Sequence, residues 1–210
     1  IAGQVDQFLS QNGPFNSKDL IAVMVGLHDV QAQYNRLQNE PGVSRDVLIA
    51  GVQQAGNELG AQVVRLTNLG AKVVVSTIYS LSLSPFATGE ELAHPGDGRA
   101  TLLDQLTTEY NKALRLKLNE VADGGHSVGL IQSDELVLSM VRYPPNYVLN
   151  NVTEAACNVA LPDCNQTTLV PLAIDSYGAY WLWADDTRLG AAGQSRVAGL
   201  AVNRVRTNPF

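Results

Sequence analysis

The sequence predicts an α/β fold built on a parallel sheet. Residues 20–26 form a continuous apolar run and residues 71–78 a second apolar segment, a pattern typical of strands buried on both faces of a parallel sheet. Residues 43–69 lie between them with helical periodicity and end at Gly70, which gives the helix, glycine, strand order of a crossover. We therefore expect a parallel core of strands from the runs at Leu20, Val73 and Val128, flanked by helices on both faces.

The periodicity predicts three helices in the first 122 residues. The first covers residues 1–11 and ends at Asn12-Gly13-Pro14. The second, residues 43–69, has Ser44 as its N-cap and Gly70 just past its end. Residues 80–98 are rich in proline and glycine and predict a long loop. The third helix, residues 99–122, ends at a glycine pair and leads directly into a strand at 127–132.

The remaining residues predict shorter elements. We expect a short helix at 134–142, an extended loop over 143–171, a brief strand at 180–183 and a final helix at 193–205. No internal repeat or linker interrupts the chain, and 210 residues suit one domain spanning residues 1–210.

Charge and hydropathy exclude two classes of partner. The formal net charge is −6, whereas nucleic-acid binding needs clustered basic side chains, so we expect no nucleic-acid partner. No apolar run approaches the ~20 residues that span a bilayer. The chain starts at Ile1, which is neither a methionine nor the start of a signal peptide, and we expect that a preceding segment has been removed or is missing.

The two cysteines predict a local disulfide. Cys157 and Cys164 lie seven residues apart in a stretch whose proline, aspartate and asparagine favour a loop. Such a bond indicates an exported protein, while two free thiols in a cytosolic protein is the alternative. The cysteine spacing does not suit a zinc site and the three histidines are scattered, so we expect no metal.

Two short polar motifs follow apolar segments, where open α/β sheets bind ligands. They are Gly26-Leu27-His28-Asp29 and Asp185-Asp186-Thr187-Arg188. Taken singly, the first is equally compatible with a helix cap, and the second with a helix start that carries a surface ion pair.

Together the motifs resemble those of the SGNH (GDSL) hydrolases, especially secreted and autotransporter-type bacterial esterases. Residues 68–75, 110–115 and 151–157 share the resemblance, which therefore spans nearly the whole chain. It implies a three-layer α/β/α, flavodoxin-like fold and a serine hydrolase that acts on small or lipid esters without a cofactor. It also implies a secreted, periplasmic or outer-membrane location.

The resemblance assigns site residues by position. Gly26 and Asp29 match the substrate-binding block of the family, and His28 stands where the family has an oxyanion-stabilising asparagine. Asp185 matches the aspartate that orients the catalytic histidine, but Arg188 occupies the position of that histidine. A histidine ring can donate to an oxyanion, whereas arginine stays protonated and cannot accept the proton of a serine. We expect both motifs to face one crevice.

The family's Gly-Asp-Ser nucleophile block would fall upstream of Ile1, so no serine is assigned as the nucleophile. Ser176 lies too close to Asp185 and on the wrong side of the motif order, and we interpret it as a turn residue. His94 is a better reserve base than His126, which precedes a strand. The sequence leaves three hypotheses: a truncated or impaired ester hydrolase, a noncatalytic binding or structural module of the same fold, and an unrelated α/β binding protein.

The resemblance also predicts an open sheet edge. The family's first strand lies beside its third, so its absence would expose the apolar edge from Leu20 to Val25. An exposed edge of this kind invites pairing. We expect it to be covered by an amino-terminal fragment, by a second copy of the chain or by a rearranged segment.

Overall fold

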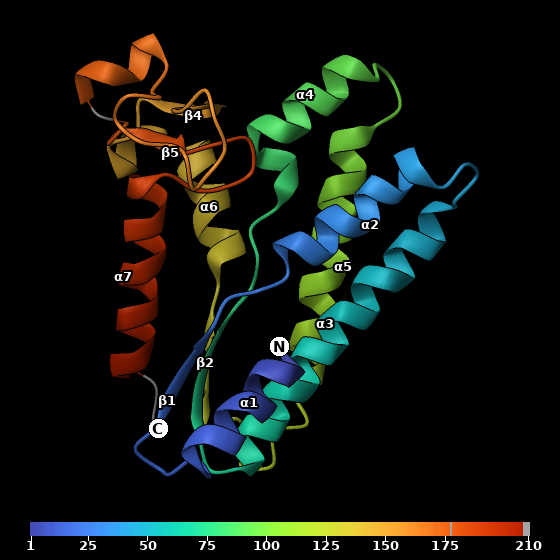
Figure 1. Cartoon of the computed structure of the whole chain (residues 1–210), viewed down its shortest axis with the longest axis vertical. Helices are drawn as coiled ribbons and strands as arrows, with labels where there is room; N and C mark the ends of the chain where they lie inside the picture. The colour runs from blue at the N-terminus through green and yellow to red at the C-terminus, as the bar shows by residue number, and fades with distance from the viewer. Residues whose placement is uncertain (177, 208–210) are drawn as a thin grey trace. The chain divides into compact units, whose positions relative to one another are not determined.

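Three parallel strands form the larger of two sheets in the protein. The structure, a computed structural model, describes residues 1–176 and 178–207. The strands are β1 (Leu20–Val23), β2 (Lys72–Ser76) and β3 (Val128–Ile131), in the order β1-β2-β3. Ile21 pairs with Val73 and Val73 with Val128, both in parallel. The predicted α/β class and parallel core are confirmed (Figure 1).

The chain divides into two compact units, each with its own sheet. Unit 1 comprises residues 1–78 and 106–132 and the described part of the C-terminus from residue 201, and unit 2 comprises residues 79–105 and 133–200. The helices that contribute to unit 1 are α1 (Ala2–Asn12), α2 (Leu27–Asn39), α3 (Arg45–Asn68), α5 (Arg99–Leu118) from Leu106 onward, and the end of α7 (Ala191–Thr207).

Caps and glycines set the ends of α3 as the sequence predicts. The Ser44 hydroxyl accepts a hydrogen bond from the Val47 amide at 3.4 Å, and Gly70 follows the helix with a φ of 89°. Helix α5 ends earlier than expected, at Leu118, because turns occupy the residues between it and the Gly124-Gly125 pair.

Helices α3 and α5 approach each other closely at two glycines of α3. A β-carbon at Gly56 would overlap the carbonyl oxygen of Tyr110, and one at Gly60 would lie 2.5 Å from the β-carbon of Lys117. Neighbouring Leu59 and Val63 of α3 are buried. The absence of side chains at Gly56 and Gly60 therefore permits the close contact that buries this part of the unit 1 core.

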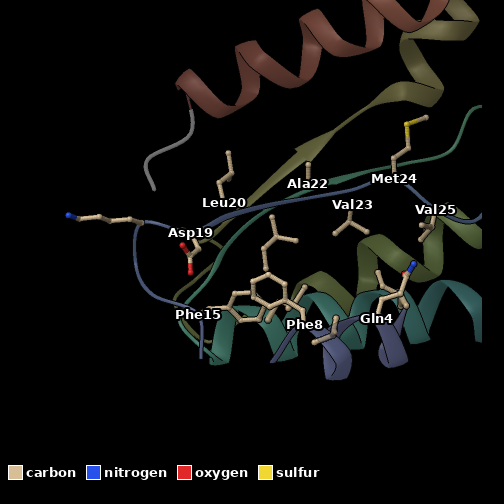
Figure 2. Close-up of a pocket in the computed structure, with 14 residues that line it drawn as sticks. Gln4, Phe8, Phe15, Asp19, Leu20, Ala22, Val23, Met24 and Val25 are labelled. Atoms are coloured by element: carbon tan, nitrogen blue, oxygen red, sulfur yellow. The ribbon is translucent and has the colours of Figure 1, made fainter. Parts of the chain in front are cut away.

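Strand β2 matches its predicted burial and β1 does not. Val73, Val74 and Val75 are almost fully buried in the middle of the sheet. In β1 only Val23 is buried, and the Leu20 side chain is 45% exposed (Figure 2). The expectation that both faces of residues 20–26 are buried is wrong, whereas the expected open edge from Leu20 to Val25 is present, because β1 is a terminal strand of the sheet.

Unit 2 contains a small parallel sheet of β4 (Asn151–Ala155) and β5 (Trp181–Trp183). Trp183 is fully buried, its indole N–H donates to the Val152 carbonyl at 2.8 Å, and its ring meets Tyr79 edge to face at 5.6 Å. The other elements are α4 (Pro85–Ala93), α6 (Ser133–Arg142), most of α7, the start of α5, and the 3-10 helices η1 (Leu81–Leu83), η2 (Pro144–Tyr147) and η3 (Pro171–Ser176).

The two long loops expected in unit 2 are interrupted by regular structure. Within residues 80–98, the Ser84 hydroxyl accepts from the Ala87 amide and Pro85 occupies the first turn of α4, so this proline starts a helix. Within residues 143–171, η2 and β4 replace the expected extended loop, and β4 is held by its pairing with β5.

The close contact at Gly56 predicts that Gly56→Ala lowers the unfolding free energy by roughly 1–3 kcal/mol, because the added methyl group must push α3 away from α5. Gly89→Ala in α4 is the matched control. Its added methyl group meets no atom within 4 Å, so the better helix former should raise stability by about 0.5–1 kcal/mol. Urea unfolding of both variants measures the difference, and equal effects would contradict the close contact.

Candidate functional site

The loop between β5 and α7 holds the predicted Asp185 to Arg188 motif. It closes as a tight turn, in which the Ala184 amide donates to the Arg188 carbonyl at 2.8 Å and Trp183 forms a β-bridge with Leu189. Asp185 lies inside this turn with only 3% of its surface exposed. A buried carboxylate needs hydrogen-bond donors, and the turn supplies them.

Five donors surround the two carboxylate oxygens of Asp185, and the longest contact is from the Thr187 hydroxyl to Oδ1 at 3.5 Å. The amides of Thr187 and Arg188 donate to Oδ1 at 3.0 and 2.7 Å. The amide of Leu161 donates to Oδ2 at 3.0 Å, and the Arg188 Nη1 donates to the same oxygen at 3.1 Å. Backbone amides and the guanidinium thus satisfy the hydrogen-bond acceptors of the carboxylate.

The Arg188 side chain joins the Asp185 turn to the disulfide loop, residues 157–164. Its Nη1 also donates to the Leu161 carbonyl at 3.1 Å, so Leu161 binds this pair through both its amide and its carbonyl. Cys157 contacts the turn as well, because its amide donates to the Ala184 carbonyl at 3.0 Å. Asp185 and Arg188 therefore connect two loops of unit 2.

The disulfide predicted from the cysteine spacing is present. Cys157 and Cys164 are bonded with an S–S distance of 2.00 Å. Within the loop that they close, Leu161 presents its amide to Asp185. The bond therefore restricts the loop that supplies one of the donors.

The surroundings of Asp185 favour its ionised form. Burial by itself raises the pKa of this carboxyl, but the amides of Leu161, Thr187 and Arg188, with the charge of Arg188, outweigh burial and hold its pKa below the ordinary value. Burial is also the main reason that the pKa of Tyr79 is raised. The Tyr79 hydroxyl donates to the Thr187 carbonyl at 3.0 Å and so supports the same turn.

The Gly26 to Asp29 motif lies in unit 1, after β1. Gly26 has a φ of 123°, and a side chain there would overlap the ring of Tyr110. The Tyr110 hydroxyl donates to the Val25 carbonyl at 3.1 Å, which fixes the entry to α2. Burial, and to a smaller extent Asp29, raise the pKa of Tyr110, so this hydroxyl keeps its proton.

His28 and Asp29 are exposed in the first turn of α2. The first amides of a helix have no intrahelical partner, and an exposed histidine ring beside them can donate a hydrogen bond to a polar ligand. His28 and the Asp185 turn belong to different units. That the two motifs form one crevice stays a prediction.

The other residues considered from sequence have local roles. The Ser176 hydroxyl donates to the Ala173 carbonyl at 3.5 Å at the end of η3, in line with a turn residue. His94 ends α4, and His126 is exposed before β3. Sequence reasoning missed Leu161 and Tyr79, because backbone donors and distant contacts leave no sequence motif. The alternative interpretation of the second motif, a helix start with a surface ion pair, agrees better with the structure than a catalytic site does. Asp185 and Arg188 form an ion pair, although the pair is partly buried and α7 begins only at Ala191.

Neither membrane-spanning helices nor metal-binding clusters are found within residues 1–176 and 178–207. Comparisons with protein-family models and with curated proteins gave no match to the chain. What the site can do therefore follows from its own chemistry. Arg188, which the SGNH resemblance places where a triad requires a proton acceptor, donates to Asp185.

The carboxylate network predicts an acid-dependent loss of stability. The pKa of Asp185 is lower in the folded state than in the unfolded state, where it is about 4. The ionised carboxylate therefore stabilises the fold fully above the unfolded-state pKa, and this stabilisation is lost as pH falls through the folded-state pKa. Asp185→Asn should lower the unfolding free energy at pH 7 by roughly 2–4 kcal/mol, because an amide nitrogen would face donors. Its stability should vary less between pH 5 and pH 2 than that of the wild type. Asp186→Asn, next to it in sequence, is the control, and a matching effect there would refute the network.

Removing the disulfide should weaken the same network. Cys157→Ser with Cys164→Ser should lower the unfolding free energy by roughly 2–3 kcal/mol, the loop-closure contribution expected for a short loop. Combined with Asp185→Asn, the loss should be smaller than the sum, because both changes release Leu161. Thermal unfolding of the single and combined variants measures this coupling, and strict additivity would contradict it.

Proposed function

We propose that this chain is an SGNH-type α/β domain that binds a small or lipid ester without hydrolysing it. The observation that carries the proposal is the closed hydrogen-bond set of Asp185. In a serine hydrolase the aspartate accepts from a histidine, and that histidine takes the proton of the nucleophile. Here the Asp185 oxygens accept from three backbone amides, from the Thr187 hydroxyl and from Arg188.

Arg188 excludes the usual route for proton transfer. A guanidinium stays charged at any ordinary pH, so it cannot remove a proton from a serine. Enzymes that lose a triad member keep only about 10³–10⁴-fold acceleration from binding and oxyanion stabilisation. A domain with Arg188 at this position thus binds an ester more effectively than it cleaves one.

The Gly26 to Asp29 motif supports ligand binding. It follows the carboxyl end of a parallel strand, the usual position of ligand sites in open sheets. Tyr110 fixes the backbone at Val25, while His28 remains exposed and can donate to a carbonyl oxygen. An oxyanion-type donor without a proton acceptor would polarise an ester and leave it intact.

The disulfide supports an exported location for this domain. Disulfides persist in oxidising compartments such as the periplasm or the exterior of the cell. The disulfide and the SGNH resemblance together favour a secreted or periplasmic domain that binds small or lipid esters.

Hydrolysis of p-nitrophenyl butyrate tests the absence of catalysis. The wild-type chain and Arg188→His should both match the rate of an inert protein, because a histidine at residue 188 would still meet a carboxylate occupied by amides. Arg196→His is the matched control, since Arg196 is exposed and its guanidinium contacts only the Tyr147 carbonyl among the bonds described. A fluorophosphonate serine probe should not label the chain. Steady turnover that this probe blocks would overturn the proposal.

Binding is tested separately by NMR titration of the same ester. The amides of Gly26 and His28 should shift saturably, and His28→Ala should weaken binding, while His126→Ala should not. His126 is also exposed but lies before β3. If the amide resonances do not shift at the highest ester concentration, the binding role is contradicted, even if catalysis is absent.

A further inference from the structure

Two asparagines of the chain begin the tripeptide sequon, Asn-x-Ser/Thr, that directs N-glycosylation. The sequons are Asn151-Val152-Thr153 and Asn165-Gln166-Thr167, and neither has proline at its middle position. A tripeptide of this kind also arises by chance, so the surroundings of each asparagine decide whether it can be modified. The two sequons differ in exposure, in backbone pairing and in the residue two positions before the asparagine.

The second sequon lies on the surface of unit 2, directly after the disulfide loop. Residues 165–167 are exposed, and none of them belongs to a helix or strand. A β-bridge between Cys157 and Leu169 joins the two ends of this segment. The Asn165 amide donates to the Thr168 hydroxyl at 2.8 Å, and the Asn165 carbonyl accepts from the Thr168 amide at 3.1 Å. A surface turn held by such local bonds can enter an enzyme while the neighbouring sheet stays folded.

The Asn165 side chain presents its nitrogen at the surface. Its Oδ1 accepts from the Thr167 amide at 2.9 Å and from the Thr167 hydroxyl at 2.7 Å, so the carbonyl end of the side chain is held within the sequon. Its Nδ2 donates to the Asp163 carbonyl at 2.8 Å. Because Asn165 is exposed, water or an enzyme group can replace this bond at little cost.

The residues just before Asn165 add a charge and a compartment. Asp163 is exposed two positions before Asn165, where its carboxylate can bind a basic side chain of a transferase, whereas Leu149 stands at that position in the first sequon. Cys164, the neighbour of Asn165, is bonded to Cys157. A disulfide persists in the oxidising compartments that exported chains enter, and N-glycosylation is a modification of exported chains.

The first sequon is closed by the sheet of unit 2. Asn151 begins β4, pairs with Trp181 of β5 and donates its amide to the Tyr180 carbonyl at 3.4 Å. Its Nδ2 donates to the Glu154 carboxylate at 2.7 Å. A transferase would have to separate β4 from β5 to bind this asparagine in an extended conformation. The folded chain therefore presents Asn165 and withholds Asn151.

We propose that Asn165 is an N-glycosylation site, to which an oligosaccharyltransferase transfers an oligosaccharide from a polyprenyl-pyrophosphate carrier. The Asn165 Nδ2 attacks the anomeric carbon of the first sugar and forms the N-glycosidic bond, while the bond from that carbon to the pyrophosphate oxygen breaks. The departing polyprenyl pyrophosphate keeps the electron pair, and the proton lost by Nδ2 passes to a base of the transferase. The proposal rests on the exported location proposed above and is independent of ester binding.

Glycosylation of the purified, disulfide-bonded chain tests the site without requiring export. The chain is incubated with a purified oligosaccharyltransferase that requires an acidic residue two positions before the asparagine, and with a polyprenyl-pyrophosphate oligosaccharide of known mass. Intact-mass spectrometry should show the gain of a single oligosaccharide, and peptide mapping should place it on Asn165. Asn151→Gln is the matched control and should be modified like the wild type.

Substitutions within and before the sequon separate its parts. Thr167→Ala removes the hydroxyl and should abolish the mass gain, whereas Thr167→Ser keeps a hydroxyl and should retain it. Asp163→Asn removes the charge but keeps the backbone carbonyl that Nδ2 contacts, and it should slow the transfer by about tenfold or more. Asp163, Asn165 and Thr167 are exposed, so these variants should fold like the wild type.

Three results would overturn the proposal. A folded chain that gains no oligosaccharide would show that the second sequon is not an acceptor, whether or not the reduced and alkylated chain is modified. An oligosaccharide on Asn151 would show that the sheet does not protect the first sequon. Equal transfer to the wild type, Thr167→Ala and Asp163→Asn would show that the enzyme does not recognise this sequon. None of these results bears on ester binding, which the NMR titration measures.

Discussion

The Asp185 carboxylate is the interaction on which the loops of unit 2 depend. It is almost fully buried, and an ion in such a position is stable only when it is paired and hydrogen-bonded. Its donors come from its own turn and from Leu161, about two dozen residues earlier in the chain. The turn and the disulfide loop are therefore positioned by a shared charge, while β4 is held to β5 by strand pairing and by the Trp183 indole, which donates to the Val152 carbonyl. A residue that the family resemblance assigns to catalysis has here a structural role.

The sheet of unit 1 is organised by burial and by backbone close approach. Its central strand is apolar and covered, and the bare surfaces of Gly56 and Gly60 allow α3 to approach α5. This arrangement leaves β1 with one paired side and one open side. On the open side the strand presents partly exposed apolar side chains such as Leu20 and Met24.

The sequence predicted those features that local patterns determine. Helix α3, its Ser44 cap, the buried β2 and the disulfide all follow from periodicity, capping chemistry or spacing. The sequence does not predict helix α4, because the proline and glycine content of residues 80–98 favours a loop, although Ser84-Pro85 is also a helix start. The apolar run at residues 20–26 does not reveal whether β1 has one neighbour or two, and the open edge is expected from the family resemblance alone. At the site, the residue types were predicted, whereas the donors to Asp185 come from backbone groups that carry no sequence signature.

The contact between Gly26 and Tyr110 links two positions that are far apart in sequence. The ring of Tyr110 occupies the space that a side chain at residue 26 would need, and its hydroxyl holds the preceding carbonyl. Substitution at either position is therefore restricted by the other. Because the φ of 123° favours glycine at residue 26 whatever stands at residue 110, the glycine should persist among homologous chains, and loss of the tyrosine hydroxyl should coincide with another donor to the carbonyl of residue 25. The glycine with its carbonyl donor would then be a means of recognising distant relatives whose other motifs have diverged.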